Sequence, residues 1–439
     1  MKRRIFSLLC LVLCVFLCGC AVIVGNDTDT ADAITKDTAT QSESQTTQDS
    51  PQSDAATDSV SDVINGTESD AVTDVTGDET TKDQDNSTTP SDDPVKLVMV
   101  GDVLMHDPVL DSGKLQGGGY SYKHLFDNVA DVVGAADIAM FNQEVIIAGE
   151  KYGIDGYPRF NAPFELADAI AAVGFDVAVH ATNHTLDVGK AAMLDCLNYW
   201  ETKYPDIEVV GMHDSPADAE KISIVEKNGI KIAILNYTYT VNGAGTAALA
   251  ASPYLVDILD ENRIRRDVKA ADELADFVIV AAHWGTEYTH KPSTSQKKWA
   301  KLMLECGVDL VLGTHPHVIQ PVEWMEDDQG NKMLVYWSLG NFINSTGETG
   351  KGKGARMLGA MADVELSRDE KGEVYISSAY AVPLVTHIKY QTYGITTYKF
   401  SDYTEAMLAE SEAVRIDSTF TYQYCVDTFE EIFGKFLKK

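Results

Sequence analysis

Cysteine is scarce outside the first twenty residues of this chain. Four of the seven cysteines lie in that stretch, which leaves only Cys196, Cys306 and Cys425 in the remaining sequence. Three widely spaced cysteines do not make a disulfide framework, and at most one pair can form. The chain also contains no Cys-x-x-Cys motif, so a zinc site built from thiolates is not expected.

Positive charge is scarce as well. Asp and Glu number 67 against 35 Lys and Arg, which gives a formal net charge of −32. The segment of residues 26–94 accounts for −16 and residues 2–4 for +3, which leaves −19 for the folded part. An acidic surface of that size repels phosphate backbones, so nucleic acid is not expected as a partner. After the N-terminus, no apolar stretch approaches the ~18 residues that a membrane-spanning helix needs. The sequence therefore predicts no internal membrane span.

The N-terminus carries a targeting pattern. Three basic residues at positions 2–4 precede an apolar run over residues 5–17, an arrangement typical of a secretory signal. The ending Leu-Cys-Gly-Cys at residues 17–20 resembles the bacterial lipobox, which implies a signal peptide over residues 1–20 and a lipid on Cys20. The alternative is an ordinary signal peptide or an uncleaved anchor. In either case we expect the folded domain to lie outside the cytoplasmic membrane, and the lipid on Cys20 would anchor it to the cell membrane.

Residues 21–94 have the composition of a disordered segment. Residues 26–94 hold eighteen acidic residues, two lysines and almost no aromatic residue. Such a segment cannot bury enough apolar surface to offset its ordering entropy, and its like charges extend it. We expect an acidic tether that lifts the folded part through the cell wall, with a ligand-binding tail as the alternative.

From residue 95 the sequence alternates between short apolar runs, typical of buried strands, and helical stretches. Alternation of this kind predicts an α/β fold. Asn228-Gly229, between two further runs, predicts a β-hairpin. We assign residues 95–388 to the main domain and 389–439 to a C-terminal extension, which either packs on the domain or forms a partner surface. The predicted helices cover residues 163–173, 191–203, 262–274 and 293–305.

Residues that can bind metals follow five of the predicted strands. They are Asp102, Glu144, Asn183 with His184, His283, and His315 with His317. Ligand sites in α/β sheets lie beyond the carboxyl ends of the strands, so we expect these residues to converge. Each of them alone is a weak signal, and the prediction depends on the coincidence of all five. Carboxylate, amide and imidazole ligands without a thiol suit Mn, Fe or Zn better than calcium.

The same segments, in the same order, resemble the poly-γ-glutamate capsule-synthesis (CapA) family, a branch of the calcineurin-like metallophosphoesterases. The resemblance extends from about residue 95 to residue 388 and does not include the tether or the chain end. The segments that carry it are residues 98–102, 141–144, 181–189, 283–288, 313–320 and 338–342.

The resemblance implies a four-layer α/β/β/α sandwich with two divalent metal ions, Mn, Fe or Zn, at one edge. By motif, Asp102 and His317 would bind one ion and Glu144 would bridge. The other ion would be bound by Asn183, His283 and His315.

The catalytic group implied by the resemblance is His184, beside Asn183, which would orient or protonate the reacting phosphate. Two positions depart from the phosphoesterase pattern. The usual Asp-x-His is absent, and the nearest histidine, His106, lies four positions after Asp102. The bridging position holds Glu144 instead of Asp, as in the capsule branch.

Three further residues are candidates for a metal or substrate contact. His106 is a candidate ligand in the longer loop. Asn161 precedes a helix and either contacts substrate or forms the turn that starts that helix. Arg356 either binds an anionic substrate, since a guanidinium suits carboxylate or phosphate, or is a solvated surface residue.

Two functions fit these features. The first is a metal-dependent hydrolase that acts on an anionic envelope polymer or a phosphoester, with two ions activating water and His184 as general acid. The second is a non-enzymatic subunit of a capsule synthesis or export complex, with membrane subunits as partners, in which metal holds the fold or binds the polymer. Fold and site together do not determine the substrate.

Overall fold

The computed structural model describes residues 93–243, 245–346, 348–389 and 393–438. The predicted signal peptide, the predicted lipid site Cys20 and nearly all of the tether lie outside this part of the chain. Among the described residues, no helix is both long and apolar enough to cross a membrane.

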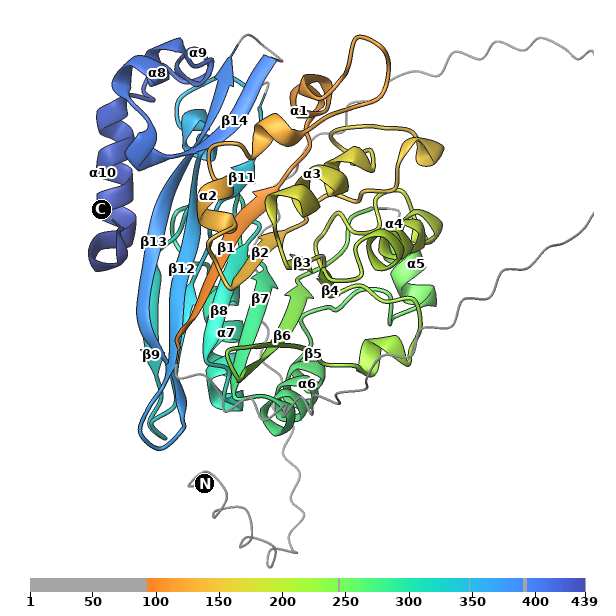
Figure 1. The fold of residues 1–439 in the computed structure, drawn as a ribbon, viewed down its shortest axis with the longest axis vertical. Coiled ribbons are helices and arrows are strands. Elements are labelled where there is room, and N and C mark those ends of the chain that lie inside the picture. The colour runs from red at the N-terminus through yellow and green to blue at the C-terminus, as the bar shows by residue number, and fades with distance from the viewer. Residues whose placement is uncertain (1–92, 244, 347, 390–392, 439) are drawn as a thin grey trace, which may run out of the picture. The chain divides into compact units, whose positions relative to one another are not determined.

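The first of two sheets is mixed (Figure 1). It consists of β1 (Val95–Val103), β2 (Ile138–Asn142), β3 (Val177–Val179), β4 (Glu208–Val210), β11 (Asn341–Ile343), β12 (Leu358–Arg368), β13 (Val374–Lys389) and β14 (Tyr393–Lys399). The spatial order is β14-β13-β12-β1-β2-β3-β4, with β11 also paired to β1. Strands β1 to β4 run parallel, so their carboxyl ends meet at one edge. Strands β12 to β14 extend the sheet with antiparallel pairs.

The second sheet has a parallel centre and antiparallel edges. It consists of β5 (Ser223–Lys227), β6 (Ile230–Thr238), β7 (Phe277–His283), β8 (Leu310–Thr314), β9 (Val322–Glu326) and β10 (Lys332–Tyr336). The spatial order is β5-β6-β7-β8-β10-β9, in which β6, β7, β8 and β10 are parallel. The predicted hairpin joins β5 to β6, and Asn228 and Gly229 have the positive φ angles (50° and 73°) that a tight hairpin turn favours.

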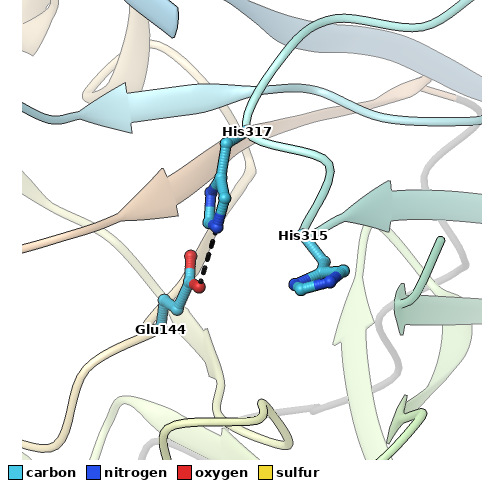
Figure 2. A group of neighbouring side chains, drawn as sticks. All are labelled: Glu144, His315 and His317. Carbon is cyan, nitrogen blue, oxygen red and sulfur yellow. Dashed lines mark ion pairs between the residues drawn. The ribbon is translucent and has the colours of Figure 1, made fainter. Parts of the chain in front are cut away.

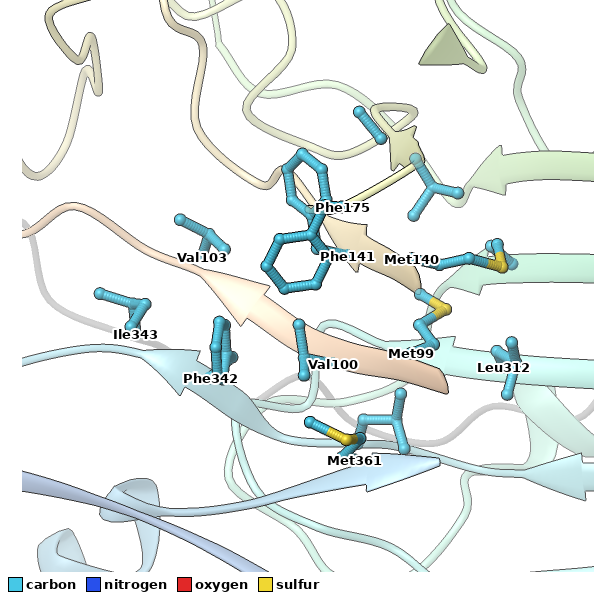
Figure 3. Close-up of a cluster of buried hydrophobic side chains, with 14 of the residues drawn as sticks. Met99, Val100, Val103, Met140, Phe141, Phe175, Leu312, Phe342, Ile343 and Met361 are labelled. Carbon is cyan, nitrogen blue, oxygen red and sulfur yellow. The ribbon is translucent and has the colours of Figure 1, made fainter. Parts of the chain in front are cut away.

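Alternating residues of β7 belong to two different apolar clusters. Ile279 faces a cluster shared with the first sheet, whereas Val280 faces a cluster shared with helices α6 and α7 (residues 261–274 and 294–306). Figure 3 shows the first cluster, in which Met99 of β1 and Leu312 of β8 come from different sheets. Because the sheets pack on each other and helices cover their outer faces, the predicted four-layer α/β/β/α sandwich is confirmed.

Helix α7 starts and stops at recognisable capping residues. Ser293 and Gln296 form a capping box before α7, and Gly307 ends that helix in the left-handed conformation, at φ 96°. The four predicted helices correspond to α3, α4, α6 and α7. The α-helices are α1 (Asp107–Ser112), α2 (Ala130–Val133), α3 (Glu165–Val173), α4 (Lys190–Lys203), α5 (Gly245–Ala251), α6 (Glu261–Leu274), α7 (Thr294–Cys306), α8 (Glu405–Glu410), α9 (Ala413–Ile416) and α10 (Tyr422–Phe433).

The C-terminal helix α10 lies beside β13 (Figure 1). Phe429 and Phe433 on this helix are buried in the same cluster as the residues between the sheets. The backbone N–H of Lys438 donates to the carbonyl of Ala381 in β13, at 2.9 Å. Phe429 and Phe433 are therefore core residues. Cys196, Cys306 and Cys425 are all free thiols.

Candidate metal centre

The seven residues predicted to form the site lie together at the carboxyl ends of the strands. Each is at most 7% exposed, and they are Asp102, Glu144, Asn183, His184, His283, His315 and His317. The sheet register accounts for part of this convergence. Asp102 in β1 pairs with Asn142 in β2, and His283 in β7 pairs with Thr314 in β8.

The turn after β8 is strained. His315 and His317, on either side of Pro316, have φ angles of 93° and 56°. Residues other than glycine rarely adopt this region, which costs of order 1–3 kcal/mol and is concentrated at functional sites. The strained turn directs both imidazoles toward Glu144 (Figure 2).

Glu144, His315 and His317 form a group that could hold a metal ion. One ligand atom from each lies within 4.8 Å of the others. Both carboxylate oxygens of Glu144 and the Nδ1 atom of His315 are buried without a hydrogen-bond partner. Buried polar atoms are normally hydrogen-bonded, so unsatisfied ones call for an explanation. A cation among these lone pairs would satisfy them, so the donor set fits a divalent metal.

Asp102 is connected to this group through hydrogen bonds. Its Oδ1 accepts from Nδ2 of Asn142 at 2.9 Å, and its Oδ2 lies 3.1 Å from Nδ1 of His317. The Nδ1 atom of His317 is also 3.1 Å from Oδ1 of Asn341, and Nε2 faces Glu144 Oε1 at 3.5 Å. The ring of His317 is therefore held on both sides.

His283 joins the opposite side of the group. Its Nε2 atom lies 2.7 Å from Oδ1 of Asn183 and 3.8 Å from Oε1 of Glu144. Its Nδ1 atom lies 3.0 Å from the hydroxyl of Thr314, and its ring centre is 4.8 Å from that of His315. The structure thus brings together all six residues predicted as metal ligands. Side chains of four of them, Asp102, Asn183, His283 and His317, are hydrogen-bonded within the protein, whereas Glu144 and His315 have buried side-chain atoms without a partner.

Burial sets the charge of the site residues. It lowers the pKa of His283 and of His315 well below the ordinary value, and neighbouring imidazoles reinforce the shift. Burial raises the pKa of Glu144. Burial also opposes the charging of His317, but Glu144 and Asp102 outweigh it and raise the pKa of this imidazole to about 9. His283 and His315 are consequently neutral imidazoles, the form that binds metals.

His184 lies beside the group and is oriented by a carboxylate. Its Nδ1 atom is 2.6 Å from Oδ2 of Asp187, which also accepts from the backbone N–H of Phe160 at 3.0 Å. Nδ2 of Asn242 lies 3.4 Å from the same Nδ1 atom. A cavity of about 500 Å³ opens next to this ring, lined by Arg159, Asn183, His184, Tyr239 and Glu287 among others. A substrate in this cavity would contact His184.

The three lesser candidates occupy different environments. His106 packs against Phe160, with ring centres 5.3 Å apart. Burial, followed by the charges of His317, His184 and Arg356, lowers the pKa of His106 to about 4, which places it near the site. Both atoms of the Asn161 amide are engaged by the backbone of residues 148–153.

Arg356 is 8% exposed and is therefore not a solvated surface residue.

Asp187 and Asn341 were not predicted from the sequence as partners of the site histidines. Asp187 had a signal, because it follows His184 by three residues within one turn. Asn341 lies in residues 338–342, one of the segments that carry the resemblance, but its contact with His317 is a long-range contact that no local pattern predicts.

Comparison with known proteins gives a family match. The family model "Bacterial capsule synthesis protein PGA_cap" matches residues 96–346. The PGA biosynthesis protein CapA of Bacillus subtilis is 31% identical over 264 residues, which cover 60% of this chain and 66% of that protein. The capsule biosynthesis protein CapA of Bacillus anthracis is 30% identical over 260 residues, which cover 58% and 60% of the two chains. This chain thus spans slightly less than two thirds of each relative.

Among solved structures, the NAD nucleotidase of Haemophilus influenzae aligns with a TM-score of 0.39 and 11% identity, over 79% of this chain and 57% of that one. The sequence match is the stronger finding, and it contains every residue of the candidate metal centre from Asp102 to His317. With more than half of its length matched, the chain belongs to the PGA_cap family of bacterial capsule synthesis proteins.

Proposed function

We propose that this protein is a membrane-anchored, extracytoplasmic hydrolase that depends on two divalent metal ions and acts on an anionic envelope polymer or phosphoester. The observation that carries the proposal is the buried Glu144 carboxylate, whose two oxygens have no hydrogen-bond partner although three imidazoles surround it. A charge left in this state is costly unless a cation or a proton compensates it. A catalytic metal centre accounts for that cost.

The residues divide into roles by their contacts. Glu144, His315 and His317 would hold metal through their ligand atoms that lie within 4.8 Å of one another. Asp102, Asn183 and His283 would complete the ligand set. Divalent ions bound there would supply an activated water and neutralise charge that develops on the substrate. Hydrogen bonds fix the orientation of these rings: one joins Thr314 and His283, and in the other Oδ1 of Asn341 accepts from Nδ1 of His317.

His184 would act as the proton-transferring group or would orient the reacting phosphoryl group. With Nδ1 directed at Asp187, the Nε2 atom is the one available to donate a proton to a leaving group or to hold a phosphoryl oxygen. The cavity beside His184 offers the cation Arg159 as a further contact for an anion. These features favour an enzyme over a purely structural metal site.

Metal content is the first test. We expect about two equivalents of a transition metal per chain by elemental mass spectrometry of the full-length protein. Asp102→Asn and His315→Ala should lose metal, whereas the control His124→Ala, which removes a half-buried histidine outside the site, should retain it. Metal-bound protein should then hydrolyse a phosphodiester or a γ-glutamyl bond. Bound metal without turnover would favour the non-enzymatic subunit, and no metal after reconstitution with Mn, Fe or Zn would contradict the proposal.

The proposed location depends on the N-terminal pattern, which lies outside the described residues. The names of the two Bacillus relatives support a role in capsule synthesis, where membrane subunits of a synthesis or export complex would be the partners. Cys20→Ser should release the protein from the membrane fraction into the medium, as judged by fractionation of cells. Retention of this variant at the membrane would contradict lipid anchoring.

A further inference from the structure

Arg356 is a buried cation beside the candidate metal centre. It lies in the short 3-10 helix η4 (Lys353–Met357), and its side chain is 9% exposed. The guanidinium carbon is 3.7 Å from the ring centre of Tyr288, and that ring centre is 5.9 Å from the one of His317. Burying a charge is costly unless it is paired. The group that pairs with Arg356 therefore indicates which ligand this guanidinium can bind.

Asn341 connects the position of Arg356 to that of His317. Its Nδ2 atom donates to the carbonyl of Arg356 at 3.0 Å and to the carbonyl of His317 at 3.1 Å. Its Oδ1 atom faces the ring of His317. The side-chain amide of Asn341 therefore holds both the backbone of Arg356 and the candidate metal ligand His317.

The C-terminal segment holds the same loop from the other side. One carboxylate oxygen of Asp417 accepts from the backbone N–H groups of Gly352 and Gly354, at 2.6 and 3.2 Å. Phe420 packs so closely on Gly354 that a Cβ there would lie 2.6 Å from its side chain. The family match ends at residue 346, so Arg356 and this support lie outside the matched region.

The partner of Arg356 is an exposed carboxylate. Nη2 of Arg356 donates to Oε2 of Glu348 at 3.0 Å, and Lys353 pairs with the same carboxylate. The Glu348 side chain is 61% exposed, in contrast to 9% for the guanidinium. Exposed carboxylates are easily rehydrated and their ion pairs contribute little, whereas a buried guanidinium needs an anion. The exposed member of the pair can thus be exchanged for another anion.

We propose that Arg356 binds a carboxylate group of the substrate, and that Glu348 occupies this position until the substrate displaces it. The inference rests on the proposed function, because it assigns a substrate-binding residue to the same site. Carboxylate is favoured over phosphate because the guanidinium already accommodates the carboxylate of a glutamate side chain. Arg356 is then a specificity-determining residue, and Glu348 is an internal competitor.

Calorimetric titration of the metal-bound, full-length protein with a short γ-glutamyl oligomer tests this inference. Arg356→Met should weaken binding about tenfold or more, since a charge-assisted hydrogen bond is lost. Glu348→Gln, at an exposed position, should tighten binding several-fold because it removes the competing charge. In the double variant Arg356→Met/Glu348→Gln, the gain in affinity from Glu348→Gln should disappear. The matched control Glu261→Gln breaks a similar exposed ion pair, with Arg265 on α6, and should leave binding unchanged.

Unchanged affinity in both Glu348→Gln and Arg356→Lys would overturn the inference, since the first variant removes the competitor and the second removes the planar fork but keeps the charge. Displacement of the oligomer by inorganic phosphate but not by acetate, in an Arg356-dependent manner, would overturn the assignment to carboxylate. Metal content and phosphodiester turnover of the same samples separate the two proposals. Normal metal and turnover with unchanged affinity contradict only the inference, whereas a wild-type protein without metal or turnover contradicts the proposed function.

Discussion

The Nδ1 atom of His184 lies 2.6 Å from Oδ2 of Asp187, and both side chains are buried. The carboxylate is itself fixed, because the backbone N–H of Phe160 donates to the same oxygen. An imidazole held in this way keeps one tautomer and one orientation, which is what a proton-transferring histidine requires. The pair therefore connects the fold of the loop after β3 to the chemistry proposed for the site.

The first prediction concerns this pair. Asp187→Asn should lower kcat by about 100-fold, because an amide no longer holds His184 in the productive tautomer. Bound metal should be unaffected, since Asp187 is not among the proposed ligands. Asp195→Asn, which removes a carboxylate from an exposed pair with Lys151, is the control and should leave kcat unchanged. Equal kcat values for wild type and Asp187→Asn would show that His184 does not transfer a proton.

A second prediction concerns the close backbone approach that positions Asp102. A Cβ on Gly101 would lie 1.9 Å from the carbonyl oxygen of Gly340, in the strand pairing that leads into Asp102. Gly101→Ala should lower the free energy of unfolding by ~1–3 kcal/mol through overpacking and should weaken metal binding. Gly117→Ala adds the same methyl group where no atom lies within 4 Å. Urea unfolding should show no loss for this control, and equal effects of the two substitutions would contradict the argument.

The third prediction is the effect of metal removal on stability. A metal present at about 100 times its dissociation constant adds roughly 2.7 kcal/mol to the stability of the folded protein. Chelation should therefore lower Tm by about 5 °C or more, and added Mn or Zn should restore it. His315→Ala lacks a proposed ligand, so its Tm should not respond to the chelator. If neither chelation nor added Mn or Zn changed the Tm of the wild-type protein, the proposed metal centre would be contradicted.

The fourth prediction uses His213, outside the site. Burial opposes its charge, but Asp257 at 2.9 Å and Asp218 at 3.4 Å outweigh burial and raise its pKa. A histidine with a raised pKa contributes stability that is present below the unfolded value of 6.5 and is lost as pH rises through the folded value. His213→Gln should therefore cost more unfolding free energy at pH 6 than at pH 9.

His124 should show the opposite dependence of stability on pH. Burial lowers its pKa, so protonation destabilises the folded protein at low pH. The stability of wild type relative to His124→Gln should fall as pH falls, in the same urea titrations. The same pH trend for His213→Gln and His124→Gln would contradict the electrostatic explanation.

Local patterns in the sequence were sufficient for much of the fold. Helix α7 follows from its capping box and its terminal glycine, and the β5–β6 hairpin follows from Asn228-Gly229, because caps and turns depend on residues adjacent in the chain. The convergence of Asp102, His283 and the other strand-end residues was predictable in part. Parallel strands bring carboxyl ends within one sheet to one edge, which accounts for β1 with β2 and for β7 with β8. The two groups come from different sheets, so only the packing of the sheets brings Asp102 and His283 together.

What the tertiary structure alone decided is the environment of each side chain. The sequence contains the Glu144 carboxylate, but only the packing of two sheets shows that both of its oxygens are buried without a partner. The sequence contains Arg356, but its stacking on Tyr288 and its pairing with Glu348 depend on a loop supported by Asp417. Burial and long-range pairing depend on which segments meet in space. A local pattern identifies the residues that can do chemistry, and the fold determines which of them lack a partner.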